Sequence, residues 1–341
     1  MKNCLSFDDV LLVPKYSEIL SRKEMSLKSN LSDDVVLEVP IISSPMDTVT
    51  ESNMVIAMSN FGGLGIIHRY NTVLKQSSLV KVSIKSGAKN VGAAVGVSGD
   101  YLERAQALYD AGCRIFCVDI AHGHHILMKN ALRELKKCFG DSVHIMAGNV
   151  ATRTAYEDLA EWGADSVRVG IGGGSICSTR IQTGHGVPTL QSVIDCSFSE
   201  FYGEVPIIAD GGIKNSGDMV KALAAGADFV MVGSLIAGTN ESPGETFEKN
   251  GQNYKVYRGM ASKDAQINWR GHYSSIEGVS SYVPLRGPVS NVLEEMVAGI
   301  RSGLSYSGAC SVVELQNTVD FITQTSSGIN ESGTHINNIN K

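Results

Sequence analysis

The sequence of 341 residues predicts an α/β protein whose single domain is a (β/α)8 TIM barrel. Segments 111–119, 163–170 and 226–233 each place a glycine between a helix-like stretch and a run rich in valine and isoleucine. A glycine in this position ends a helix in the left-handed conformation, and such apolar runs are typical of parallel strands buried on both faces. Most runs start 22 to 30 residues after the previous one, which favours eight strand–helix units over an open doubly wound sheet.

Eight runs provide the predicted strands in chain order. They span residues 40–47, 64–68, 91–97, 115–122, 144–150, 166–172, 206–212 and 229–235. Helical periodicity separates most of them, at residues 101–110, 125–138, 155–162 and 218–225. The gap before the seventh run is longer than the others.

Charge and composition exclude several functional classes. The chain carries 35 acidic and 29 basic residues, a net charge of −6, with no block of like charges. This balance disfavours nucleic-acid and membrane partners. No apolar run reaches the roughly 20 residues of a membrane helix, and the N-terminus lacks the pattern of a signal peptide. The 7 cysteines form no CxxC pair, so we expect free thiols in a cytoplasmic protein.

Polar and glycine residues gather where the predicted strands end, which is the functional face of such a barrel. Ser175 follows the sixth strand, Gly211-Gly212 the seventh, and Gly233-Ser234 the eighth. Loops after strands 7 and 8 commonly bind phosphate through backbone N–H groups near a helix N-terminus. The alternative is that these glycines only turn the chain. Two adjacent loops of this kind favour phosphate.

One cysteine and two acids are candidates for chemistry. Cys177 alone among the thiols lies in a Gly/Ser/Thr-rich loop beyond a strand, where exposure and a lowered pKa suit a nucleophile. Asp210 ends the seventh strand and is placed to hold ribose hydroxyls, and Asp119 ends the fourth. Either acid is alternatively a structural helix cap. The histidines at 122–125 have no recognisable metal-ligand spacing.

Several motifs together resemble the IMP dehydrogenase/GMP reductase family over essentially the whole chain. They are Leu5-Ser-Phe-Asp-Asp-Val-Leu-Leu-Val-Pro14 and the segments 43–51 (SSPMDTVTE), 119–124 (DIAHGH), 169–180 (VGIGGGSICSTR), 208–213 (IADGGI), 241–245 (ESPGE) and 257–260 (YRGM). The resemblance implies an oxidoreductase in which Cys177 attacks C2 of a purine nucleotide and Thr179 with Glu277 relays a proton.

The resemblance also implies binding residues. The substrate would contact Ser44, Met46, Ser175, Asp210, Gly212, Gly233, Ser234, Tyr257, Gly259 and Met260. The nicotinamide cofactor would contact Asp119, Ala121, His122, Asn149 and Gly170.

A potassium ion is implied at the backbone carbonyls of Gly172, Gly174 and Cys177. In the family, the C-terminal segment of a neighbouring subunit completes that site. The corresponding segment here is 331–335, which suggests a homotetramer. This chain has Gly172-Gly173-Gly174 where the family usually has Gly-Pro-Gly. Losing the fixed φ of proline costs about 0.4–1 kcal/mol through the unfolded chain.

The two family activities make different demands. The dehydrogenase oxidises IMP to XMP with NAD and carries an inserted pair of regulatory CBS domains and an adjacent Arg-Tyr pair in its flap. This chain has no room for the insertion at 69–90, and Arg270 and Tyr273 are not adjacent. Residues 21–24 resemble the reductase, whereas 121–123 and 257–260 resemble the dehydrogenase.

We therefore expect a GMP reductase that uses NADPH, with IMP dehydrogenase as the alternative and a non-catalytic purine-nucleotide sensor as a third hypothesis. The expected organisation is one barrel domain over 1–341, with a short N-terminal extension, an active-site flap at about 258–285 and a tail at about 325–341.

Overall fold

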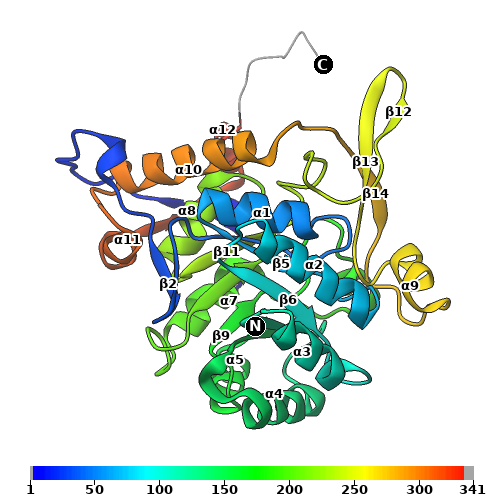
Figure 1. Ribbon diagram of the computed structural model, residues 1–341. Coiled ribbons are helices and arrows are strands. Elements are labelled where there is room, and N and C mark those ends of the chain that lie inside the picture. The colour runs from blue at the N-terminus through cyan, green and yellow to red at the C-terminus, as the bar shows by residue number, and fades with distance from the viewer. Residues whose placement is uncertain (1–2, 334–341) are drawn as a thin grey trace.

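Eight parallel strands close into a barrel in the computed structural model, which describes residues 3–333 (Figure 1). The strands are β4 (Ile41–Ser43), β5 (Leu64–Ile67), β6 (Val91–Val95), β7 (Ile115–Asp119), β8 (His144–Val150), β9 (Ser166–Val169), β10 (Ile207–Asp210) and β11 (Phe229–Val232). The barrel closes where β11 pairs with β4. The predicted fold and all eight strands are confirmed.

Helices surround the barrel. They are α1 (Ser52–Phe61), α2 (Val73–Lys85), α3 (Tyr101–Asp110), α4 (Ile126–Phe139), α5 (Arg153–Glu161), α6 (Thr179–Thr183), α7 (Thr189–Ser197), α8 (Ser216–Ala224) and α10 (Val289–Tyr306), with the 3-10 turn η3 (Gly140–Ser142) after α4. The predicted helix at 101–110 coincides with α3, and the other three differ at their ends by one or two residues. Both α6 and α7 occupy the long gap before the seventh strand, which explains its length.

The barrel interior is packed rather than open. Inward-facing side chains of the strands, including Ile42, Phe229 and Met231, form one buried cluster. Leu31 of β2 (Ser29–Ser32) and Leu37 of β3 (Val35–Leu37) belong to the same cluster. This hairpin therefore closes the N-terminal end of the barrel and leaves the C-terminal end for ligands.

The flap region begins after β11. Strands β12 (Phe247–Lys249), β13 (Gln252–Arg258) and β14 (Ser280–Pro284) form an antiparallel sheet that projects from the barrel (Figure 1). The helix α9 (Lys263–Arg270) follows β13 and precedes β14 in the chain, and it lies at the base of this sheet. The helix α9 was not predicted from the sequence.

The two ends of the chain pair with each other. The 3-10 turn η1 (Phe7–Asp9) leads into β1 (Val10–Leu12), which pairs antiparallel with β15 (Phe321–Thr323). The turn η2 (Arg22–Glu24) follows β1, while α11 (Val312–Thr318) and α12 (Ser326–Glu331) flank β15. Phe7 is buried against the barrel.

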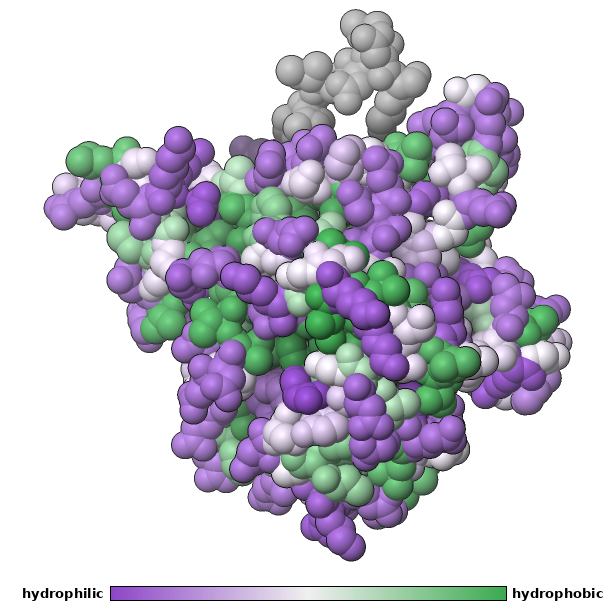
Figure 2. Space-filling model, in the orientation of Figure 1, coloured by the Kyte–Doolittle hydropathy of each residue, from purple (hydrophilic) through white to green (hydrophobic). Residues whose placement is uncertain are grey.

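The surface mixes hydrophilic and hydrophobic residues on the face that Figure 2 shows. No helix among residues 3–333 combines the length and apolar character that crossing a bilayer requires. All seven cysteines are free thiols, as the sequence predicted.

The repeated Gly-Ala-Asp sequence places two carboxylates in matching positions with different environments. Asp165 accepts a hydrogen bond from the Ile145 N–H (2.7 Å) and also pairs with Lys136 (2.7 Å). Asp228 accepts one from the Ile207 N–H (2.8 Å), and its burial raises its pKa from 3.8 to about 6.

We expect an Asp228→Asn variant to be more stable than the wild type above pH 6. The folded protein holds the Asp228 proton up to about pH 6, whereas the unfolded chain releases it near pH 3.8. The free energy of unfolding therefore falls as pH rises through this window, by about 3 kcal/mol, and the variant lacks that loss. Urea unfolding at several pH values measures the difference. Asp165→Asn, which loses an ion pair with Lys136, is the matched control and should not be stabilised; parallel curves for wild type and Asp228→Asn would contradict the prediction.

Candidate active site

A cavity of about 530 Å³ opens at the C-terminal end of the barrel strands. It receives residues from the ends of β4, β7, β8, β9, β10 and β11, from the N-terminal turn and from the flap. Every predicted catalytic, substrate and potassium residue lines this cavity, as do four of the five predicted cofactor residues. The exception is His122, whose ring instead lies 6.4 Å from that of His124.

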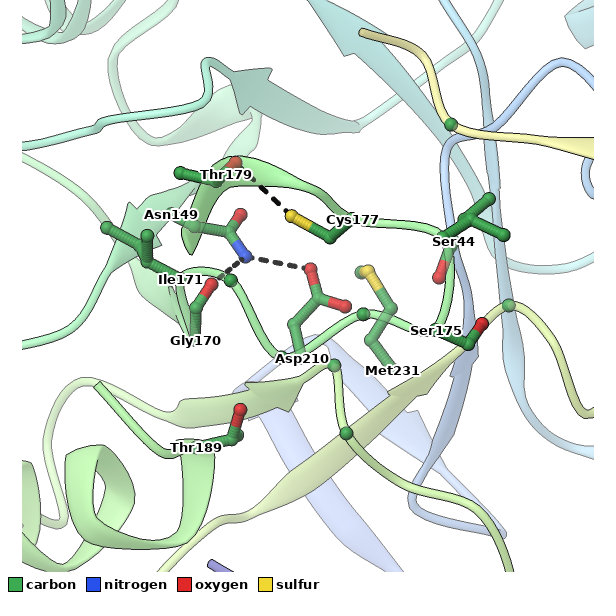
Figure 3. Close-up of a pocket in the computed structure, with 18 of the residues that line it drawn as sticks. Ser44, Asn149, Gly170, Ile171, Ser175, Cys177, Thr179, Thr189, Asp210 and Met231 are labelled. Carbon is green, nitrogen blue, oxygen red and sulfur yellow. Dashed lines mark hydrogen bonds between the residues drawn. The ribbon is translucent and has the colours of Figure 1, made fainter. Parts of the chain in front are cut away.

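The predicted catalytic groups form a hydrogen-bonded line. The Cys177 Sγ and Thr179 Oγ1 are 3.2 Å apart (Figure 3), and Thr179 Oγ1 donates to Glu277 Oε2 at 2.8 Å. Glu277 also accepts from the Ser275 hydroxyl at 3.2 Å. A hydroxyl thus lies between a thiol and a carboxylate, which is the arrangement that a proton relay needs.

Backbone hydrogen bonds hold the flap against the cysteine loop. The Ser178 N–H donates to the Glu277 carbonyl (2.9 Å), and the Val279 N–H donates to the Ile176 carbonyl (3.0 Å). Glu277 belongs to a loop far along the chain, so these bonds are what place its carboxylate near Cys177. This pairing explains how two distant loops form one site.

Cys177 differs from the buried thiols. Burial raises the pKa of Cys113 and Cys196 to about 12, and that of Cys117 to about 11. These three remain protonated thiols at neutral pH and are structural. Cys177 is only partly buried and lines the cavity, which leaves it accessible to a substrate.

Three hydroxyl groups meet beside the glycine loops. Burial raises the pKa of Tyr257, and the hydrogen bonds of this side chain with Ser175 and Ser234 partly offset that rise. Tyr257 is therefore a neutral hydrogen-bond donor at pH 7. A Cβ at Gly233 would lie 3.2 Å from both Met46 Sδ and Tyr257 Oη, so the backbone of Gly233 closely approaches these two side chains. Such a cradle of hydroxyls and loop N–H groups suits a phosphate.

A buried arginine connects the two predicted acids. Arg168 of β9 donates to Asp119 Oδ1 and Asp210 Oδ2, each at 2.9 Å. Burial alone would raise the pKa of Asp119, but Arg168 and Arg69 together lower it, so this carboxylate is ionised. The sequence analysis missed Arg168. The sequence nevertheless shows a charged residue within an otherwise apolar strand, and this pattern could have identified Arg168, because a buried charge needs charged or polar partners.

Asn149 fixes the other side of Asp210. Its Nδ2 donates to the Gly170 carbonyl and to Asp210 Oδ2, both at 2.9 Å (Figure 3). Gly170 has a φ of +146°, and a Cβ there would lie 1.9 Å from the Asp210 carbonyl oxygen. Only glycine fits at this contact. Asp210 is thus held between Arg168 and Asn149.

The cysteine loop has carbonyls available for a cation. Among residues 3–333, no group donates a hydrogen bond to the carbonyls of Gly172 or Cys177, whereas that of Gly174 accepts one from the Cys177 N–H (3.1 Å). These backbone oxygens suit potassium. Glu331 lies in α12, but Thr334 and His335 of the predicted tail segment lie outside the described residues. No cluster of His, Cys, Asp and Glu side chains able to hold a metal occurs in the described part of the chain.

The flap helix packs on the barrel through aromatic contacts. Trp269 of α9 stacks on Tyr70 after β5, with ring centroids 5.7 Å apart and planes at 17°. The guanidinium of Arg104 lies 5.8 Å from the Trp269 ring centroid. Arg270 contacts Gln266 and Ser274 within the flap.

Tyr273 is 48% exposed and lies beneath the ammonium of Lys263. Neither Arg270 nor Tyr273 is among the residues that line the cavity.

The chain matches known proteins over nearly its full length. The model of the IMP dehydrogenase / GMP reductase domain matches residues 4–335. The inosine-5'-monophosphate dehydrogenase of Nitrosopumilus maritimus is 35% identical, covering 98% of each protein. The GMP reductase of Leishmania major is 31% identical, covering 97% of this chain and 96% of the relative.

A solved structure agrees in fold. The crystal structure of a GMP reductase variant from Trypanosoma brucei in complex with guanosine 5'-monophosphate has a TM-score of 0.92 and 32% identity, covering 98% of each chain. The alignments with the Nitrosopumilus and Leishmania proteins run over 469 and 474 positions, many more than the 341 residues of this chain. Relatives of both names thus contain residues that this chain lacks, so the missing insertion does not separate the two activities. The chain belongs to the IMP dehydrogenase/GMP reductase family, whose members are oxidoreductases acting on purine nucleotides.

Proposed function

We propose that this enzyme is a GMP reductase, which converts GMP to IMP and ammonia with NADPH. The observation that carries the proposal is the line from Cys177 through Thr179 to Glu277, with Arg270 and Tyr273 both away from the cavity wall. A dehydrogenase of this family activates water with an Arg-Tyr pair of its flap, and neither Arg270 nor Tyr273 of this flap lines the cavity that contains Cys177. A reductase needs only a proton for the leaving ammonia, which Glu277 supplies through Thr179.

The nucleotide lies across the cavity in this proposal. Its 5′-phosphate binds the loops at Gly212 and Gly233 with the hydroxyls of Ser175, Ser234 and Tyr257, and Asp210 accepts hydrogen bonds from the ribose. The remaining substrate residues, which contact the base, are Ser44, Met46, Gly259 and Met260. All of them line the same cavity, which supports a single nucleotide site.

The chain's own groups carry out the deamination. The Cys177 sulfur attacks C2 of GMP and forms an S–C2 bond, while the C2–N3 π electrons move onto N3 and the thiol proton passes through Thr179 to Glu277. The C2–N bond then breaks, and the amino group leaves as ammonia with a proton passed from Glu277 through Thr179. When bound, NADPH would supply a hydride for C2, and the electrons of the S–C2 bond would return to the Cys177 sulfur as IMP leaves. Asp119, Ala121, Asn149 and Gly170 would hold the nicotinamide half of the cofactor, and His122 remains a predicted contact.

The remaining features of the proposal concern the assembly. We propose one barrel domain over residues 1–341 in a cytoplasmic homotetramer, with potassium at the carbonyls of Gly172, Gly174 and Cys177. The carbonyls of Gly172 and Cys177, which accept no hydrogen bond among residues 3–333, support the cation. The family pattern of a partner's C-terminal segment at this site supports the tetramer.

The second candidate is IMP dehydrogenase with NAD. The similarity to the Nitrosopumilus maritimus enzyme supports it. A purine-nucleotide sensor without turnover is the third candidate, and the intact line of Cys177, Thr179 and Glu277 opposes it.

Two parallel assays test the proposal by following reduced-nicotinamide absorbance in potassium buffer. One contains GMP and NADPH, the other IMP and NAD. We expect absorbance to fall in the first, with IMP formed, and to stay constant in the second. A rise only in the second would identify a dehydrogenase, and silence in both with GMP bound would support the sensor.

A further inference from the structure

The ammonium group of Lys255 lies in a cage of backbone carbonyls. Lys255 of β13 is 5% exposed. Its Nζ donates to the carbonyls of Thr239 (3.1 Å), Asn240 (3.2 Å) and Ser242 (2.7 Å). The three donors of the ammonium are thus satisfied by three acceptors of one turn. Rings of backbone carbonyls are the ligands with which proteins replace the water shell of a monovalent cation.

This arrangement is unusual for a buried lysine. Lys255 forms no ion pair within 4.0 Å among residues 3–333, although Glu241 acts on it at longer range. A buried charge is costly unless it is fully hydrogen bonded, and an apolar side chain on β13 would avoid that cost. The cage is therefore a specific connection between β13 and the turn at 239–242.

The turn at 239–242 continues directly from the phosphate loop. The Ile236 N–H donates to the Gly233 carbonyl (3.2 Å), the Thr239 hydroxyl donates to the Ile236 carbonyl (2.8 Å), and the Ser242 hydroxyl donates to the Thr239 carbonyl (2.8 Å). Hydrogen bonds thus run without a break from Gly233 to the acceptors of the ammonium. We therefore expect a shift of the turn to move the loop that carries Ser234.

Lys255 also shares a strand with Tyr257. Residues two apart on a strand point to the same face, and both side chains are 5% exposed. Tyr257 hydrogen bonds with Ser234 on the loop after β11. The ammonium therefore connects the same two elements, β13 and the loop after β11, that this hydroxyl pair connects.

We propose that Lys255 is a positioning residue for the phosphate subsite. Its ammonium acts as a built-in monovalent cation that fixes β13 against the loop after β11, so that the hydroxyls of Tyr257 and Ser234 meet around the phosphate. The inference rests on the proposed nucleotide site and adds to it a residue that touches no ligand.

The test compares GMP with guanosine, which lacks the phosphate. In Lys255→Ala, we expect the dissociation constant for GMP, measured by calorimetry, to rise about tenfold, while that for guanosine is unchanged. At saturating GMP, kcat should remain within about twofold of wild type. Propylammonium replaces the atoms removed and should restore GMP affinity, whereas 1-propanol, of the same shape without charge, should not.

Two further variants separate the possible failures. Lys249→Ala removes an exposed ammonium on β12, beside the Tyr282 ring of β14, and should leave the affinities for GMP and guanosine unchanged. Tyr257→Phe should weaken GMP but not guanosine; if it does not, the phosphate assignment itself is wrong. If Tyr257→Phe behaves as expected but Lys255→Ala keeps wild-type GMP affinity, weakens both ligands equally or is not rescued, the role of Lys255 is overturned. Should the alanine variant not fold, Lys255→Met, which keeps the apolar stem, is judged by the same GMP and guanosine comparison.

Discussion

A Cys177→Ser variant is expected to bind GMP and to lose turnover by a factor on the order of 10⁴ or more. Serine keeps the shape of the loop and the hydrogen bond to Thr179, but its hydroxyl does not ionise in the way that makes a thiol nucleophilic. The measurement pairs NADPH oxidation with calorimetric GMP binding.

The control for this variant is Cys138→Ser, which changes an exposed thiol on α4 and should keep full activity. Turnover of Cys177→Ser at the wild-type rate would rule out the covalent route. Loss of GMP binding along with turnover would instead mean that the loop had lost its structure.

Glu277→Gln is expected to slow the release of ammonia by about 10²- to 10⁴-fold, the usual contribution of a positioned acid or base. The amide still accepts a hydrogen bond from Thr179, so the loop geometry and GMP affinity should remain close to wild type. Single-turnover quenching with GMP alone, followed by ammonia detection, isolates this step from the hydride transfer.

Glu245→Gln, in the exposed loop before β12, provides the matched charge-neutralising control for Glu277→Gln. An equal loss of GMP affinity and of ammonia release in Glu277→Gln would argue that this carboxylate is structural. Unchanged ammonia release would remove it from the relay.

The barrel could be predicted because its strands are buried on both faces. Runs such as that of β10 need apolar residues at nearly every position, so they stand out from the sequence. The flap helix α9 carries no such signal, because its sequence, KDAQINWR, is mostly polar and only two of its residues are buried. It is defined by contacts with distant parts of the chain, above all the stack of Trp269 on Tyr70.

The candidate site shows the same division. The glycine loops and Cys177 follow strands directly, so the fold rule locates them. The position of Glu277 near Thr179 depends on a backbone pairing across the flap, and the role of Arg168 depends on two acids from other strands. Distances of this kind are set by tertiary packing, which local sequence patterns do not encode.

Because β1 pairs with β15, the order in which the chain is synthesised decides when the cavity is completed. Ser6, Phe7 and Asp8 border the cavity. Gln324, the residue after β15, holds this segment in place because its side-chain amide donates a hydrogen bond to the Asp8 carbonyl and its backbone N–H donates one to the Asp9 carbonyl. All eight barrel strands, β4 to β11, lie between β1 and β15 in the chain. During synthesis these strands therefore emerge before β15 does, so the pairing that holds this side of the cavity forms only after every strand of the barrel has been made.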